Sequence, residues 1–187
     1  VVEKKATKGE PRIKITLYQG IMKTSRFEFV LQKGTELGIS TFVPIICSRS
    51  VPKIQEEALL SRRYPRWNRI ITEAAEQSHR GKLPILKRTV DFFSACDNIE
   101  GPAIIPWEKE DKTGLKTALK RWESEHPQIV SIGVFIGPEG GFAKEEIRHA
   151  KAKGIGSVSL GERILRAETA GITTAAAIFH DFGDLGG

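Results

Sequence analysis

The chain has few residues suited to holding a metal ion, since its 187 residues include only two cysteines and four histidines. Cys47 and Cys96 lack the close spacing of zinc ligands, and the histidines are scattered along the chain. A long apolar run and a charged-then-apolar leader are also missing. We therefore expect a protein without a metal site or a membrane span, in a reducing compartment such as the cytoplasm.

Sequence signatures of several enzyme classes are absent. The glycine-rich stretch 137–142 lacks the GK[ST] ending with which a P-loop holds phosphates, and it lacks the G-x-G-x-x-G spacing of a dinucleotide fold. No serine lies in the G-x-S-x-G turn of the α/β-hydrolases. These absences argue against the use of nucleoside triphosphates or dinucleotides and against that hydrolase class.

Basic residues are in excess. Lys and Arg outnumber Asp and Glu by 29 to 23, which gives a net charge of +6 and a pI near 9.4. This balance favours a polyanionic partner, and nucleic acid is the leading candidate. A chain of this length buries roughly 70% of the surface that its unfolded form exposes, which suffices for one core with at most a small appendage.

Strand-like and helix-like patterns alternate along the chain. Apolar, β-branched runs predict strands at residues 13–18, 41–46, 85–90, 103–106, 130–136 and 158–160. Apolar residues at helical spacing predict helices at 24–37, 65–80, 91–96, 113–124, 144–153 and 169–181, with Pro65 in the first turn of its helix. This order predicts an α/β fold in which helices cover both faces of a mostly parallel sheet.

Two loops at the ends of predicted strands are the best candidates for a ligand site. Residues 137–142 follow the strand at 130–136, and residues 160–170 follow the strand at 158–160. Glycine lets the backbone approach a ligand closely, but a single loop of this kind is about as often a plain tight turn. Because this chain has two such loops at the ends of predicted strands, a ligand site is the favoured interpretation. In the helix after the first loop, Glu146 is expected to reach back to the backbone of Ala143, which is a poor N-cap.

The polar face of the helix predicted at 65–80 is dense and partly basic. It carries Arg66, Arg69, Glu73, Glu76, Gln77 and Arg80. The charge pattern fits a solvated face with internal ion pairs, and it fits equally well a surface that contacts RNA. Both interpretations stay open at this point.

Four segments together carry a resemblance to a known family. They are residues 32–38 (QKGTELG), 73–80 (EAAEQSHR), 137–142 (GPEGGF) and 160–170 (LGERILRAETA). In these segments the chain resembles the RsmE family, small-subunit ribosomal RNA methyltransferases of the SPOUT superfamily that use S-adenosylmethionine to methylate N3 of a uridine. The resemblance implies a deep C-terminal trefoil knot, a homodimer, and ribosomal RNA or the small ribosomal subunit as the partner.

The resemblance also implies a domain boundary. Members of the family usually begin with a PUA-like β-barrel. Residues 1–20 are accordingly expected to be the remnant or last strand of such a barrel with its linker, and residues 21–187 are expected to form the SPOUT methyltransferase domain.

The two loops suit S-adenosylmethionine, whose adenine has many hydrogen-bonding edges and whose sulfonium is a cation. Backbone amides and carbonyls accommodate such a ligand without a cluster of lysines. As cofactor-binding residues we predict Gly137, Pro138, Glu139, Gly140, Gly141, Leu160, Gly161, Ile164, Leu165, Arg166, Glu168, Thr169 and Ala170. Glu139 has two interpretations, a solvated loop carboxylate or a group near the sulfonium or the ribose.

Arg166 is the leading catalytic candidate, because a fixed cation beside the uracil stabilises the anion that forms as N3 loses its proton. The alternative is a structural guanidinium that ties its loop to Glu168. Glu36 and Glu73 are further catalytic candidates, as proton acceptors or as groups that orient arginines. RNA contacts are predicted for Lys33, Arg49, Arg66, Gln77 and Arg80.

Two other functions remain open. A related SPOUT enzyme that methylates a ribose 2′-hydroxyl would use the same cofactor loops, since the fold alone does not fix the acceptor. A non-catalytic RNA-binding or ribosome-assembly protein is the third possibility, and it would show no methyl transfer.

Overall fold

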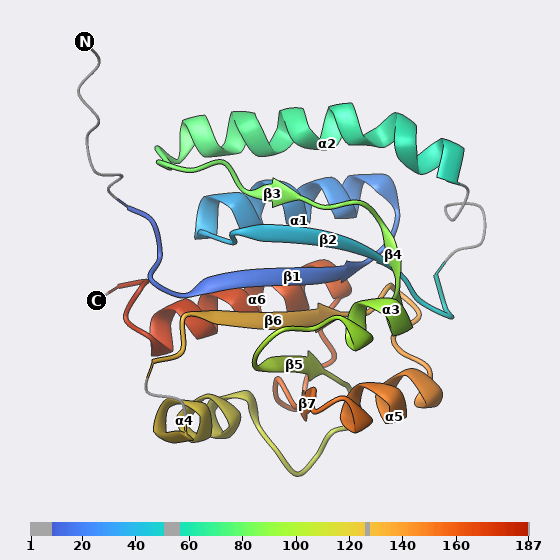
Figure 1. Ribbon diagram of the computed structural model, residues 1–187, viewed down its shortest axis with the longest axis vertical. Helices are drawn as coiled ribbons and strands as arrows, with labels where there is room; N and C mark the ends of the chain where they lie inside the picture. The colour runs from blue at the N-terminus through green and yellow to red at the C-terminus, as the bar shows by residue number, and fades with distance from the viewer. Residues whose placement is uncertain (1–8, 51–56, 126–127, 187) are drawn as a thin grey trace.

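A computed structural model describes residues 9–50, 57–125 and 128–186 of the chain (Figure 1). The strands are β1 (Lys14–Gly20), β2 (Thr41–Ile46), β3 (Ile85–Leu86), β4 (Val90–Asp91), β5 (Ala103–Pro106), β6 (Ser131–Ile136) and β7 (Gly156–Val158). The helices are α1 (Thr24–Leu37), α2 (Glu57–Gln77), α3 (Phe92–Asp97), α4 (Leu115–Glu125), α5 (Lys144–Ala152) and α6 (Ala167–Asp181).

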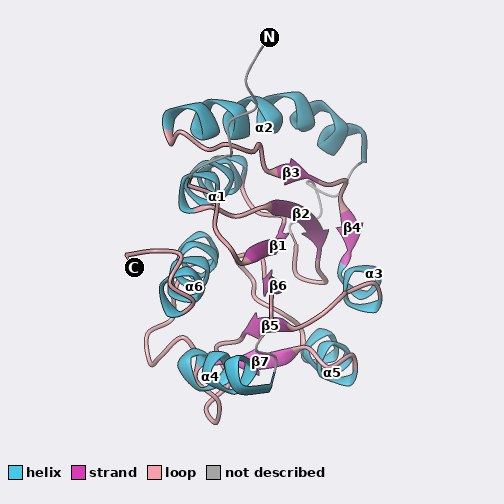
Figure 2. Cartoon of the chain, turned by 60° about the vertical axis from the view of Figure 1, so that its left-hand side comes forward, coloured by secondary structure: helices cyan, strands magenta, loops and turns pink. Residues whose placement is uncertain are grey.

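The strands form one sheet in the order β3-β2-β1-β6-β5-β7, with β4 also paired to β2, and every pair of strands is parallel. Helices α1, α6 and α4 lie on one side of this sheet, and α3 and α5 lie on the other (Figure 2). Helix α2 packs against α1 at one end of the molecule. The predicted α/β fold with a mostly parallel, doubly covered sheet is therefore confirmed.

The core has one apolar layer on each side of the sheet. On the side of α1 and α6, Phe27 packs on Trp67 with ring centroids 4.5 Å apart, and Phe179 is fully buried. On the side of α3 and α5, Tyr18 stacks on Phe135 at 4.2 Å. Because both faces are buried, the central strands are almost continuously apolar, as expected for a parallel sheet.

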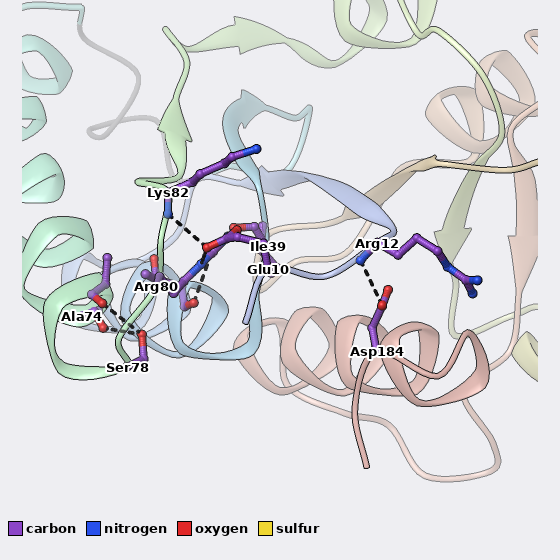
Figure 3. Close-up of polar contacts among 10 residues, drawn as sticks. Glu10, Arg12, Ile39, Ala74, Ser78, Arg80, Lys82 and Asp184 are labelled. Atoms are coloured by element: carbon purple, nitrogen blue, oxygen red, sulfur yellow. Dashed lines mark hydrogen bonds and ion pairs between the residues drawn. The ribbon is translucent and has the colours of Figure 1, made fainter. Parts of the chain in front are cut away.

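Strand β1 is central to this sheet, since it pairs with β2 on one side and with β6 on the other. The expectation that it is the last strand of a separate barrel is wrong. Its apolar residues Ile15 and Leu17 are fully buried in the shared core. The residues before it are also held to the domain: the Arg12 amide donates to the Asp184 carboxylate at 2.9 Å (Figure 3), and the Ile13 amide donates to the same carboxylate at 2.9 Å.

Several element boundaries differ from the predictions. Helix α2 is already formed at Glu57, so Pro65 lies inside it and not in its first turn. Leu60 and Trp67 are buried on the same face, and this burial outweighs the hydrogen bond that proline removes. The strand predicted at 85–90 is divided into β3 and β4, which pair with different parts of β2. Among the described helices, none has the length and apolar character that spanning a bilayer requires.

Candidate functional site

A cavity of about 420 Å³ lies beyond the carboxyl ends of β5, β6 and β7. Residues 106–108, 136–142 and 159–167 line it, together with Arg26 and Ala170. Each of these segments directly follows a strand or begins a helix at the same edge of the sheet (Figure 1). Ligands of open α/β sheets bind at this edge, because the loops after parallel strands converge there.

The structure brings the two predicted loops together in this cavity. Of the predicted cofactor-binding residues, only Glu168 and Thr169 do not line it. The two loops are about twenty residues apart in sequence, but β6 and β7 flank β5 in the sheet. The sheet order therefore places one loop on each side of the segment that follows β5.

Two glycines in and beside the first loop allow its sharp turn. Gly141 has a φ of +66°, a left-handed conformation that favours glycine. Gly20, at the end of β1, packs directly on this loop: a Cβ atom there would lie 2.4 Å from the nitrogen of Pro138. A side chain at Gly20 would push the loop out of place, so the sequence at both positions sets the shape of the cavity wall.

Glu146 holds the end of the loop at 137–142 in place. This fully buried side chain accepts a hydrogen bond from the Ala143 amide at 2.7 Å, as predicted, and a second one from the Ser48 amide at 2.8 Å. It therefore joins the start of α5 to the loop after β2. Arg49, in this loop after β2, donates to the carbonyl oxygen of Gly140 at 3.0 Å. This contact places Arg49, a predicted RNA-binding residue, beside the loop at 137–142.

Arg26 connects the two loops, although it is not among the site residues predicted from the sequence. Its guanidinium lies 3.5 Å from a carboxylate oxygen of Glu139 and 3.7 Å from one of Glu168. Glu139 also accepts a hydrogen bond from the Lys23 amide at 3.1 Å. Glu139 is thus tied to the start of α1 while it also lines the cavity, and its role near the sulfonium or the ribose stays a prediction.

Arg166 is exposed at the N-cap position of α6 and lines the cavity. Its side chain has no hydrogen-bond or ion-pair partner among the residues that the structure describes. Glu168, its predicted partner in the structural alternative, pairs with Arg26. The guanidinium of Arg166 is therefore available to a ligand.

Glu36, Glu73 and Gln77 lie elsewhere, in a second cavity of about 370 Å³ between α1 and α2. The linings of the two cavities have no residue in common. Glu36 pairs with Lys33 at 2.8 Å, and Glu73 pairs with Arg69 at 3.3 Å. Within one chain the structure thus does not bring Glu36 or Glu73 into the cavity of Arg166, although both were predicted to take part in the same reaction.

Arg80 was predicted to contact RNA, and the structure contradicts this. Its side chain is only 4% exposed. It donates to the Glu10 carboxylate at 2.7 Å and to the carbonyl oxygens of Ile39 and Thr35 at 2.7 and 3.2 Å (Figure 3). Each of its three guanidinium nitrogens donates to an acceptor inside the protein. Arg66, by contrast, is exposed, and among the described residues its guanidinium pairs with Glu28 alone, at 2.8 Å, so it remains usable as an RNA contact.

The cavity fits S-adenosylmethionine in size and in chemistry. Its volume is in the range of about 300–1,000 Å³ typical of small-molecule sites. The two loops offer backbone amides and carbonyls, and the charged side chains of the lining are balanced, with three glutamates (Glu108, Glu139 and Glu162) and three arginines (Arg26, Arg163 and Arg166), which suits a ligand with both a sulfonium and a carboxylate. Within the described ranges, no group of three or more His, Cys, Asp or Glu residues is placed to hold a metal ion.

An α/β domain with a parallel sheet and a cofactor-sized cavity over its carboxyl edge defines a broad class of nucleotide-binding enzymes. Comparison with known proteins shows which family within this class the chain belongs to. Residues 9–179 match the model of the RNA methyltransferase domain. The chain belongs to this family.

The chain is similar to proteins named "Ribosomal RNA small subunit methyltransferase E". It is 32% identical to the one from Bacillus subtilis over 182 residues, which cover 96% of this chain and 71% of that protein. It is 35% identical to the one from Synechocystis over 181 residues, which cover 95% of this chain but 57% of that protein.

Two solved structures that are similar to this chain contain S-adenosylmethionine. Lpg2936 from Legionella pneumophila has a TM-score of 0.81 at 35% identity, and the match covers 92% of this chain and 68% of that one. The methyltransferase E of Neisseria gonorrhoeae has a TM-score of 0.78 at 31% identity, with 91% and 67% covered.

Proposed function

We propose that this protein transfers the methyl group of S-adenosylmethionine to N3 of a uridine in small-subunit ribosomal RNA. The observation that carries the proposal is the exposed, unpartnered Arg166 on the wall of the cavity built from the two glycine-containing loops. The names of the relatives and the bound cofactor of two structural neighbours support it.

The cofactor supplies the reactive methyl group as a sulfonium. The protein must hold it in line with N3 of a uracil and help to remove the N3 proton. Residues 137–141 and 160–165 would hold the cofactor through their backbones. In this transfer the N3–H bond would break, with its proton passing to solvent or to a base, and a nitrogen–methyl bond would form as the sulfur–methyl bond breaks. The electron pair of that bond would stay on sulfur, so the cofactor would leave as a neutral thioether. Arg166 would stabilise the uracil anion during this transfer.

The uridine must leave its stack for N3 to reach the cavity, because base pairing hides this atom. Arg49 and Arg66 are exposed and would contact RNA phosphates, with Lys33 and Gln77 at the periphery. Arg80 is omitted from this surface because it is buried.

We further propose the finer features implied by the resemblance, namely a SPOUT domain with a C-terminal trefoil knot and a cytoplasmic location. Ribose 2′-O methylation remains the competing activity, since it would use the same cavity. The deciding experiment incubates the protein with labelled S-adenosylmethionine and either small subunits or free ribosomal RNA, and then analyses the nucleosides. N3-methyluridine supports the proposal; a 2′-O-methylated nucleoside supports the competing enzyme, and no product supports a non-catalytic protein.

A homodimer through α6 is part of the same proposal. Exposed or half-buried small residues along this helix, including Thr169, Thr173 and Ala177, would allow close packing of two helices. We expect light scattering at micromolar concentration to give about twice the mass of one chain. The mass of a single chain would contradict the dimer without affecting the proposed activity.

A further inference from the structure

We propose that Glu108 binds the ribose of the cofactor, by accepting hydrogen bonds from its two hydroxyl groups. This inference rests on the cofactor part of the proposed function and extends it to a residue outside both glycine-containing loops. Glu108 follows β5, directly after Trp107, and lines the cavity.

The carboxylate of Glu108 faces the turn of the first loop. A methyl group built on Gly141 would lie 3.7 Å from each of the two Glu108 carboxylate oxygens. This position is in the middle of the cavity, because β5 lies between β6 and β7, from which the two loops extend. A ligand held by the backbones of both loops therefore passes this carboxylate.

The turn that carries Glu108 is fixed on both sides. The Trp107 amide donates to the carbonyl oxygen of Val158 at 3.0 Å, and the Glu110 amide donates to that of Trp107 at 3.0 Å. The Glu110 carboxylate accepts hydrogen bonds from the Ser157 hydroxyl and, at 3.4 Å, from Lys151. Ser157 in particular holds the pKa of Glu110 below its ordinary value, so this anchor stays ionised at neutral pH.

Glu108 itself has no hydrogen-bond or ion-pair partner within the described part of the chain. Its near neighbour Glu110 has three, namely Ser157, Lys151 and the Lys112 amide, and Glu139, which also lines the cavity, is paired with Arg26. A rigidly held turn thus presents one free carboxylate to the cavity. Preorganised groups of this kind bind a ligand at low entropic cost.

The ribose suits this carboxylate better than the cationic groups of the cofactor do. A carboxylate has two acceptor oxygens, and the adjacent 2′- and 3′-hydroxyls offer two donors at matching spacing. The same pairing of a carboxylate at a strand end with a ribose diol is found in dinucleotide-binding folds. Glu139 follows β6 and Glu168 lies in the first turn of α6, and both carboxylates are held by Arg26 at the start of α1, so neither is as free as Glu108 to accept from the ribose.

The test measures binding by calorimetry with three ligands that share the ribose but differ elsewhere. S-adenosylmethionine has a sulfonium and an amino-acid group, S-adenosylhomocysteine has a neutral sulfur, and 5′-methylthioadenosine lacks the amino-acid group. We expect Glu108→Ala to weaken all three by a similar factor of about 10 to 100, the range for hydrogen bonds to a charged group. Glu108→Gln should weaken them less, because its amide oxygen still accepts one hydrogen bond.

A selective loss would overturn the proposal. If methylthioadenosine keeps its affinity while the other two lose theirs, Glu108 binds the amino-acid group. If only S-adenosylmethionine is weakened, Glu108 acts on the sulfonium, and unchanged affinity for all three removes Glu108 from the site. Glu145→Ala is the matched control, since it removes the same charge from an exposed position on α5 outside the cavity. No RNA is present, so these outcomes are independent of which atom is methylated.

Discussion

Replacing Arg80 with alanine is expected to lower the free energy of unfolding by about 3–5 kcal/mol, the usual result of removing one partner of a buried ion pair. The variant leaves the Glu10 carboxylate, which is 15% exposed, without its cation. It also removes the hydrogen bonds that the carbonyl oxygens of Ile39 and Thr35 accept. Urea unfolding followed by circular dichroism measures this change.

The control is Arg121→Ala, which removes an exposed arginine–glutamate pair, between Arg121 and Glu125 on α4. These two side chains are 60% and 54% exposed, so water solvates either one when its partner is removed, and the loss of the pair should move the unfolding midpoint little. If Arg80→Ala unfolds at the same urea concentration as the parent, the structural role of Arg80 is wrong. A loss of RNA affinity in that folded variant would restore the prediction of an RNA contact.

The pair of Arg80 with Glu10 also makes the difference in unfolding free energy between the parent and Arg80→Ala depend on pH. Burial by itself raises the pKa of Glu10, but the hydrogen bond and charge of Arg80 hold it below its ordinary value of 4.5. A lowered carboxyl pKa stabilises the fold above the ordinary value, and this contribution is lost as pH falls through the lowered one. The difference between parent and Arg80→Ala should therefore be greatest near neutral pH and should shrink in acid.

The sequence predicted most of the fold because apolar periodicity reflects which face of each element is buried. The prediction for β1 was wrong, because the residue pattern of a single strand is the same whether the strand ends a barrel or lies in the centre of a sheet. The pairing of β1 with both β2 and β6 depends on contacts far apart in sequence. The start of α2 was predicted too late for a similar reason. Pro65 suggested the first turn of a helix, but the turns before it are stabilised by the burial of Leu60, which is a tertiary effect.

The candidate site was predictable where glycine marked it and hidden where ordinary residues form it. The loop at 137–142 stands out by composition. Arg26 and Glu108 have no local signal, since an arginine in a first helical turn and a glutamate after a strand are common on any surface. Arg80 shows the opposite error: its place in a basic helix pattern suggested a surface role, but the chain before β1 covers it with Glu10.

Replacing Arg166 with alanine is expected to lower the single-turnover methylation rate by roughly a hundredfold or more, the scale seen when one preorganised donor to a developing charge is lost. Cofactor affinity should stay within a few-fold of the parent, because the loop backbones provide most of the contacts. Arg166→Lys should recover little, since a point charge does not reproduce a planar pair of donors. Arg148→Ala, at an exposed position on α5 outside the cavity, controls for the loss of one positive charge.

Glu168→Gln distinguishes catalysis from loop structure. Glu168 pairs with Arg26, and Arg166 has no described partner, so the two changes should have separate effects. We expect Glu168→Gln to disturb cofactor binding through the Arg26 contact, and Arg166→Ala to affect the rate alone. If both variants lose cofactor affinity and rate in parallel, Arg166 supports the loop and the catalytic assignment is wrong. A rate loss that is confined to the Arg166 variants and persists at saturating RNA supports a role of its guanidinium in the transfer step, because a role in holding the loop would lower cofactor affinity and a role in binding RNA would be overcome by excess RNA.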